Sequence, residues 1–259
     1  MAVVELIGVG KVYLDSGRET AAIEAIESIS GKVESGSFVC IVGPSGCGKS
    51  TLLEIIAGLQ PASRGLVRIA GQPVRGPHPG LAMVFQEDSL LPWRTVIDNV
   101  AFGLEVRGVP RKERRAKAMW ALELVGLADF ASRFPRELSG GMRQRVAIAR
   151  ALVVDPEVLL MDEPFGALDA QTRLRLAIEL LRIWERTRVT VMFVTHDMTE
   201  AVLLADRVWL LSRRPSRVKA DLQIEIPRPR GPETLTEPVL HEYVEELWRG
   251  LRDEFVSIP

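Results

Sequence analysis

The sequence predicts an α/β fold with a mostly parallel β-sheet at its core. Five short runs are dominated by Val, Ile, Leu, Met and Phe, as expected for strands that are buried on both faces of a parallel sheet. These runs occupy residues 38–42, 81–85, 158–161, 189–194 and 208–211. Segments with helical spacing alternate with several of them, which is typical of a sheet covered by helices.

Two regions depart from this alternation. Residues 96–154 have helical spacing and no convincing strand, which predicts an inserted α-helical subdomain. The N-terminal segment VVELIGVGKVYL has short alternating runs that suit an antiparallel β-subdomain. Residues 213–259 contain a Pro-rich stretch and an amphipathic segment, and they are too short for a separate regulatory domain. We therefore expect a single domain over residues 1–259, with residues 213–259 as its C-terminal tail.

The composition excludes several classes of protein. The net charge is −1, so the chain lacks the basic bias of a general nucleic-acid-binding protein. Two cysteines, Cys40 and Cys47, are too few and too close for a disulfide framework, which favours a reducing cytoplasm. The N-terminus does not look like a signal peptide, and no apolar stretch reaches the roughly 18 residues that span a bilayer. We expect a soluble chain that needs other chains for any membrane role.

Residues 43–51 match the phosphate-loop pattern GxxxxGK[ST]. The match lies between the apolar run FVCIV and the helical segment TLLEIIAGL, which is the strand, loop and helix context that this loop requires. Glycines allow the backbone to turn its N–H groups toward phosphate oxygens, and the helix adds its positive end. Lys49 can reach the β and γ phosphates, and the Ser50 hydroxyl can ligate Mg²⁺. The nucleotide-binding residues predicted here are Gly43, Pro44, Ser45, Gly46, Cys47, Gly48, Lys49, Ser50 and Thr51. Taken alone, the loop leaves kinases, GTPases and helicases open.

Two acids follow the apolar run VLLM, namely Asp162 and Glu163. In proteins with a phosphate loop, an Asp at such a strand end holds Mg²⁺. A neighbouring Glu can then orient or deprotonate the attacking water. The alternative is a solvated strand end, and the phosphate loop favours the catalytic interpretation.

The segment LSGGMRQR, residues 138–145, resembles the signature LSGGQ of the ABC ATPases. It lies upstream of the strand that carries Asp162, where that family has it. A Ser-Gly-Gly sequence before a helix can hold an anion, although it can also be a helix cap without a ligand. Position 142 is Met where the family has Gln, but Ser139 and the glycines are kept, so ATP binding is still expected. The resemblance extends over about residues 4–211 and implies a P-loop NTPase fold.

Further residues match this family in order along the chain. Gln86 resembles the Q-loop glutamine, Asp169 belongs to a segment that resembles the D-loop, and His196 resembles the switch histidine. Tyr13 corresponds to an aromatic that stacks on adenine. Gln86 could instead be a polar strand end, His196 a hydrogen-bonded core histidine and Tyr13 a packing residue. The resemblance implies a catalytic set of Glu163, His196 and Gln86. It implies Mg²⁺ ligands from Ser50, Gln86 and Asp162. It implies further ATP contacts from Tyr13, Ser139, Gly140, Gly141 and Asp169.

The resemblance also implies partners. ABC ATPases work as head-to-tail homodimers, with ATP between the phosphate loop of one subunit and the signature of the other. The segment QEDSLLPWRTVIDN resembles importer ATPases, and the motifs taken together are most similar to the nitrate, sulfonate and taurine uptake group. This implies two membrane-spanning permease subunits, an external solute-binding protein and no nucleic acid. It places the chain peripherally on the cytoplasmic face of the inner membrane. The docking candidates are Leu90, Leu91 and Trp93, and the alternative is that some of them fill the local core.

Three alternatives stay open from the sequence. The chain could serve an exporter, it could be a soluble ABC ATPase that acts on DNA or ribosomes, or it could bind ATP without hydrolysing it. Long coiled-coil or basic insertions would favour the second alternative, and none is visible. The transported solute is not encoded in the motifs of an ATPase subunit.

Overall fold

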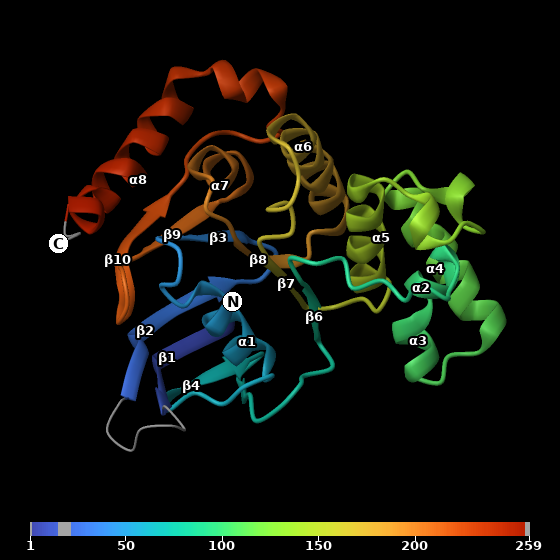
Figure 1. The fold of residues 1–259 in the computed structure, drawn as a ribbon, viewed down its shortest axis with the longest axis horizontal. Coiled ribbons are helices and arrows are strands. Elements are labelled where there is room, and N and C mark those ends of the chain that lie inside the picture. Colours follow the sequence, from blue (N-terminus) through green and yellow to red (C-terminus); the bar gives the residue numbers. More distant parts are fainter. Residues whose placement is uncertain (1, 15–21, 257–259) are drawn as a thin grey trace. The chain divides into compact units, whose positions relative to one another are not determined.

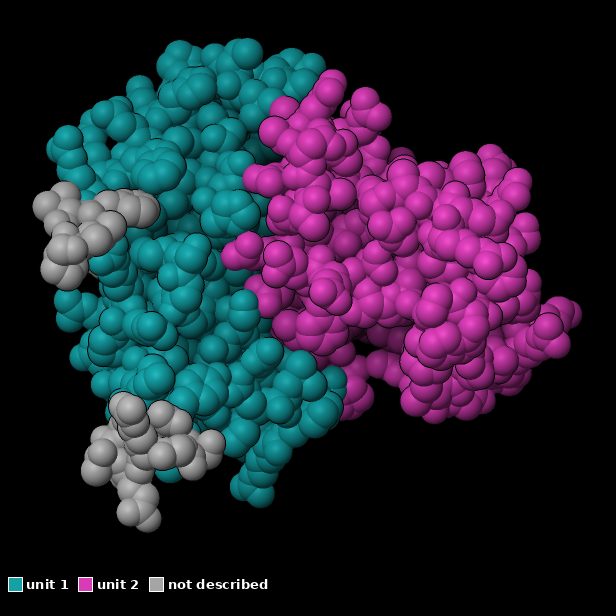
Figure 2. Space-filling view, viewed as in Figure 1, with its two compact units in different colours: residues 1–78, 190–259 teal, residues 79–189 magenta. Residues whose placement is uncertain are grey.

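The computed structural model describes residues 2–14 and 22–256. The chain divides into two compact units (Figure 2). One unit comprises residues 1–78 and 190–259, and the other comprises residues 79–189. Each unit contributes strands and helices of the predicted α/β fold (Figure 1).

The first unit is built on a sheet in the order β5-β4-β1-β2-β10-β9-β3-β8. Its strands are β1 (Ala2–Leu14), β2 (Ala22–Glu34), β3 (Phe38–Val42), β4 (Arg64–Ile69), β5 (Gln72–Pro73), β8 (Thr190–Val194), β9 (Arg207–Leu211) and β10 (Ser216–Gln223). β1 pairs antiparallel with both β2 and β4, whereas β3 is parallel to its neighbours β8 and β9. The predicted N-terminal antiparallel region and the parallel core are therefore confirmed.

The tail is more closely integrated than its sequence suggested. β10 pairs with β9 and β2, so part of the expected tail is a strand inside the sheet. It is followed by the short helix η3 (Pro232–Thr236) and by α8 (Pro238–Val256). α8 lies along α7 (Met198–Leu204), as Figure 1 shows, and buries Leu240, Leu247 and Leu251.

The core of the first unit surrounds β3. Every side chain of β3 is at most 1% exposed, and β8 is equally buried. Burial of an aliphatic side chain of this size contributes about 1.5–3 kcal/mol, so the strand that leads into residues 43–48 is firmly held. Trp209 on β9 covers Gly31, where an added Cβ would lie 2.7 Å from the indole ring. Only glycine fits beneath this ring.

The second unit contains two parallel strands, β6 (Leu81–Val84) and β7 (Val158–Asp162). Between them the described chain is helical and forms no strand. The helices of this unit are α2 (Val96–Val100), α3 (Phe102–Val106), α4 (Arg111–Leu124), η1 (Ala128–Phe130), η2 (Pro135–Glu137), α5 (Gly140–Leu152) and α6 (Ala170–Thr187). Among the described residues, no helix has both the length and the apolar character that crossing a membrane requires.

Candidate functional site

The phosphate loop connects β3 to α1 (Lys49–Ala57) in the first unit. Gly46 and Gly48 have φ angles of +73° and +102°, in the left-handed region that side chains disfavour. Gly43 packs so closely that an added Cβ would lie 3.1 Å from Cys47 Sγ. The glycines of the motif therefore allow a tight turn directly at the N-terminus of a helix, where backbone N–H groups can bind an anion.

Lys49 is folded back onto the loop. Its Nζ donates to the carbonyl oxygens of Gly43, at 2.9 Å, and Pro44, at 3.1 Å. The side chain is only 5% exposed. The structure thus holds an ammonium group inside the turn of the phosphate loop, next to the N-terminus of α1.

Tyr13 lies beside the start of α1. Its hydroxyl is 3.2 Å from the hydroxyl of Thr51 and donates to Gln60 Oε1 at 3.0 Å. The ammonium of Lys11 lies 5.1 Å from the centre of the tyrosine ring. Tyr13 remains 39% exposed, so part of the ring is accessible to a ligand. The structure therefore brings the predicted adenine contact to the phosphate loop.

His196 follows β8 at the same edge of the sheet. β8 runs parallel to β3, with Ile41 opposite Val194, and Thr195 donates its N–H to the Ile41 carbonyl at 3.2 Å. The carboxyl ends of neighbouring parallel strands form the usual ligand edge of an α/β sheet. His196 is exposed there, and the next residue, Asp197, caps α7 by accepting from the N–H of Glu200 at 3.0 Å.

In the second unit, Gln86, Asp162 and Glu163 share one strand edge. β6 and β7 are parallel, with Val84 opposite Met161, so the residues that follow both strands emerge together. Gln86 Nε2 and Glu163 Oε2 each lie 3.5 Å from the position that a Cβ on Gly166 would occupy. Glu163 has a φ angle of +42°, which is strained for this residue type. Such strain is common where a side chain is held for a function.

The predicted signature forms the N-terminus of α5. Ser139 is the N-cap residue, and its hydroxyl accepts from the N–H of Met142 at 3.3 Å. Gly140 and Gly141 are the first helical residues and face Leu168 and Thr172, respectively. Ser139 is exposed. The helix therefore presents its N-terminal N–H groups near an accessible hydroxyl.

Asp169 caps the neighbouring helix α6. Its carboxylate accepts from the N–H of Thr172 at 2.9 Å. Hydrogen bonds from the side chain and the backbone of Thr172 hold the pKa of Asp169 below its usual value. Asp169 is therefore ionised at neutral pH and exposed at the start of α6.

A cavity of about 650 Å³ in the second unit joins three of the predicted motifs. Residues from the Q-loop, the signature helix and the segment before α6 line it, including Gln86, Gly140, Arg143 and Leu168. The sequence did not single out Asp88 or Arg150. The only signal for Arg150 was its spacing of seven residues from Arg143 on the same helix.

Each unit thus gathers one group of predicted residues. The first unit brings together Tyr13, residues 43–51 and His196, and the second brings together Gln86, Asp162, Glu163, residues 139–141 and Asp169. The described residues contain no cluster of three or more His, Cys, Asp or Glu side chains that could hold a metal ion alone. Mg²⁺ in nucleotide sites usually needs only one or two protein ligands, because phosphates and water supply the others.

Comparisons with known proteins identify the family. The family model described as ABC transporter matches residues 26–166. The nitrate import ATP-binding protein NrtD of Synechocystis sp. is 45% identical, over 96% of this chain and 94% of its own. The taurine import ATP-binding protein TauB of Rhizobium johnstonii is 49% identical, over 82% of this chain and 81% of its own.

A solved structure shows the same fold. The ATP-binding cassette MJ0796, solved as a dimer in a post-hydrolysis state with ADP and Pi, matches with a TM-score of 0.73 and 33% identity. The match covers 86% of this chain and 100% of that cassette. The predicted fold class is therefore confirmed, and the chain belongs to the ABC transporter family as one of its ATP-binding ATPase subunits.

Proposed function

We propose that this ATPase subunit drives an importer for solutes of the nitrate, sulfonate and taurine type. The observation that carries this proposal is the 45% identity to a nitrate import protein over 96% of the chain. Similarity of this extent includes the segments outside the nucleotide motifs. The taurine import relative supports the same substrate group.

ATP binding begins at the phosphate loop and the N-terminus of α1. The N–H groups of residues 45–51 surround the β phosphate, and Lys49 exchanges its two carbonyl partners for phosphate oxygens. This exchange is favourable because an ammonium bonds more strongly to an anion than to a neutral carbonyl. Tyr13 stacks on adenine through the ring face opposite Lys11.

The oxygen donors of Ser50, Gln86 and Asp162 suit Mg²⁺, which prefers hydroxyl, carbonyl and carboxylate ligands. The bound ion would neutralise charge on the β and γ phosphates. Glu163 accepts a proton from the attacking water, and its strained backbone and its position beside Gly166 hold the carboxylate in place. His196 positions the water and contacts the γ phosphate.

The signature acts on the nucleotide of a second copy of the chain. Ser139 and Asp169 are exposed at the starts of α5 and α6, where each can meet a partner subunit. Gly140 and Gly141 leave the first N–H groups of α5 accessible to the γ phosphate. ATP closes this head-to-tail homodimer because only the closed state makes both sets of contacts. In the proposed arrangement, residues 96–154 act as an inserted helical subdomain and residues 213–259 as a tail.

Two permease subunits would receive the closing motion on the cytoplasmic face of the inner membrane, with solute delivered by an external binding protein. Trp93 is 71% exposed and Leu91 is half-buried, so both can contact a permease. Leu90 is 9% exposed, which favours the alternative that it fills the local core. A loop sequence alone does not show which of two adjacent leucines points inward.

The proposal is tested by Mg²⁺-dependent phosphate release from ATP and by solute uptake in the native cell. Glu163→Gln should lower turnover about 100-fold or more while ATP binding is kept, because general-base catalysis is lost. Loss of nitrate, taurine or alkanesulfonate uptake on replacing the wild type with Glu163→Gln would support import. Unchanged uptake of all three, or lost export of another compound, would contradict the proposed direction and substrate group.

A further inference from the structure

Three arginines of the signature helix α5 point to two sides of it. Arg143 and Arg150 are seven residues apart, which is about two helical turns, so they lie on one face. Arg145 follows Arg143 by two residues and therefore lies on the opposite side. Each face makes a different set of polar contacts.

Arg150 donates hydrogen bonds to the backbone just after Gln86, the Q-loop glutamine. Its two terminal nitrogens donate to the carbonyl oxygens of Ser89, at 2.7 Å, and Asp88, at 2.8 Å. Burial lowers the pKa of Arg150, and the Asp88 carboxylate opposes this shift. The guanidinium is therefore partly withdrawn from water, where hydrogen bonds to carbonyls are stronger than in solvent.

Arg143 adds a contact to the same segment. Its Nε donates to Asp88 Oδ2 at 2.9 Å, and one terminal nitrogen donates to the Leu138 carbonyl, also at 2.9 Å. Asp88 Oδ1 in turn accepts from the N–H of Leu90 at 3.1 Å. Ser89 has a φ angle of +47°, so the segment makes a turn that ordinary residues disfavour. Three bonds from α5 thus hold residues 88 and 89.

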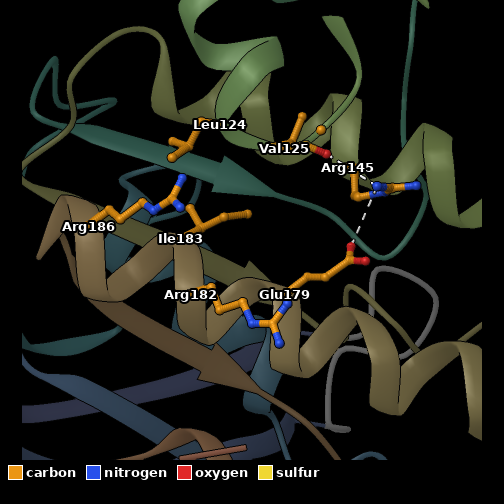
Figure 3. A pocket seen from close by; sticks show the side chains of 8 residues that line it. Leu124, Val125, Arg145, Glu179, Arg182, Ile183 and Arg186 are labelled. Atoms are coloured by element: carbon orange, nitrogen blue, oxygen red, sulfur yellow. Dashed lines mark hydrogen bonds and ion pairs between the residues drawn. The ribbon is translucent and has the colours of Figure 1, made fainter. Parts of the chain in front are cut away.

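The opposite side of α5 is attached to two helices. Arg145 donates to the Val125 carbonyl, at 3.2 Å, just past the end of α4 and pairs with Glu179 of α6, at 3.6 Å (Figure 3). These residues line a cavity of about 190 Å³. The signature helix is therefore fixed on one side to α4 and α6. On the other side it is fixed to residues 86–89, which we call the Q-loop segment.

We infer that Arg150, supported by Arg143, is a positioning residue that makes the Q-loop segment move with the signature helix. The inference rests on the proposed roles of Gln86 and Ser139. In a head-to-tail dimer, Ser139 of one chain serves one nucleotide while Gln86 of the same chain serves the other. A rigid link between the two segments therefore couples the two ATP sites.

The first test compares Arg150→Gln with wild type in steady-state ATP hydrolysis by the full chain. Wild type should show a Hill coefficient for ATP of about 2, as expected for two coupled sites. In Arg150→Gln the coefficient should fall to about 1, and the Mg²⁺ concentration for half-maximal activity should rise roughly 5-fold. A merely structural role would lower the activity or the melting temperature without changing either quantity.

Arg107→Gln is the matched control. Arg107 also donates to two backbone carbonyls of the same unit, Val154 at 2.8 Å and Pro79 at 2.7 Å, but it does not touch the Q-loop segment. Its loss should leave the Hill coefficient and the Mg²⁺ dependence at wild-type values. Arg143→Gln, which removes one of the three bonds to residues 88 and 89, should reproduce the effects of Arg150→Gln in weaker form.

Amide hydrogen exchange provides a readout that needs no catalysis. The N–H groups of Leu90 and Leu91 bond to Asp88 and Asn99 side chains, and their exchange should become about 10-fold faster in Arg150→Gln but not in Arg107→Gln. Unchanged exchange, or a wild-type Hill coefficient in a folded and active Arg150→Gln, would overturn the inference. If the wild type itself does not hydrolyse Mg²⁺-ATP, the proposed function fails, and the exchange comparison still decides whether Arg150 holds the Q-loop segment.

Discussion

The phosphate loop and the signature both bring glycines to the N-terminus of a helix, but they differ in construction. In the phosphate loop, Gly48 precedes α1 in a left-handed conformation and no side chain caps the helix. Lys49 and Cys47 are buried within the turn. In the signature, Ser139 is extended and caps α5 with its own hydroxyl, and it is exposed.

This difference shows which motif can bind a nucleotide without help. The phosphate loop carries its own cation, since Lys49 is already held inside the turn. The signature offers N–H groups and one hydroxyl on an open helix end, and the guanidinium of its neighbour Arg143 is bonded to Asp88 and to the Leu138 carbonyl. A helix N-terminus alone attracts anions only weakly when it is exposed to water. We therefore expect the signature to need a phosphate that another subunit already holds.

The largest effect on ATP turnover should come from substitutions that disrupt the phosphate loop or the signature separately. Lys49→Ala and Ser139→Arg should each lower turnover about 1000-fold, because the first removes a cation that stabilises charge in the transition state and the second puts a side chain too large for close approach in place of a small hydroxyl. Only Lys49→Ala should weaken ATP binding to the isolated chain. Equilibrium binding of a fluorescent ATP analogue would measure this difference.

Mixing the two variants tests whether the motifs act across subunits. A mixed dimer has one site made of an intact phosphate loop and an intact signature, so activity should return on mixing. The control is each variant assayed alone at the same total protein concentration. Activity that stays absent in the mixture would show that the two motifs serve the same chain.

Two substitutions at Ser139 should have smaller effects on stability and turnover, and together they separate helix capping from phosphate binding. Ser139→Ala should cost about 1 kcal/mol of stability, because the N–H of Met142 loses its acceptor. Ser139→Asp keeps an acceptor for the cap but brings a negative charge toward the phosphate. It should retain the wild-type melting temperature and lose about 100-fold in turnover.

Thermal unfolding and phosphate release, measured on the same preparations, distinguish the two roles. Equal melting temperatures for Ser139→Ala and wild type would show that the cap contributes little. Full activity in Ser139→Asp would argue that this residue does not approach a phosphate.

The strands of the parallel core were predictable because each is an unbroken apolar run. Residues 81–85 were predicted and Leu81–Val84 is observed, and the other four runs agree as closely. β10 was not recognised, because it is a short segment with several charged residues, and its pairing with the distant strand β2 and the nearby strand β9 is not written in its own composition. Such a strand is defined by its neighbours rather than by its own composition.

The site residues likewise divide into those that the sequence predicts and those that it does not. The motif residues could be located because glycine, lysine and acid spacings carry their chemistry in sequence. The contacts of Arg150 to Asp88 and Ser89 could not, since they join positions about 60 residues apart through backbone carbonyls that any residue possesses. The burial of Leu90 likewise depends on how its loop is folded.

The smallest effect on ATP hydrolysis should come from substitutions of Tyr13. They test whether nucleotide binding at the phosphate loop needs a contact to the base as well as contacts to the phosphates. Stacking of a base on an aromatic ring is worth about 1–3 kcal/mol by alanine substitution. Tyr13→Ala should therefore raise the KM for ATP about 10-fold and leave kcat nearly unchanged. Tyr13→Phe keeps the ring and loses only the hydroxyl contacts to Thr51 and Gln60, so its KM should stay close to that of wild type. Because stacking tolerates any base, GTP should show the same pattern. An unchanged KM in Tyr13→Ala would mean that adenine does not use this ring, and that the phosphate loop supplies nearly all of the nucleotide affinity of the isolated chain.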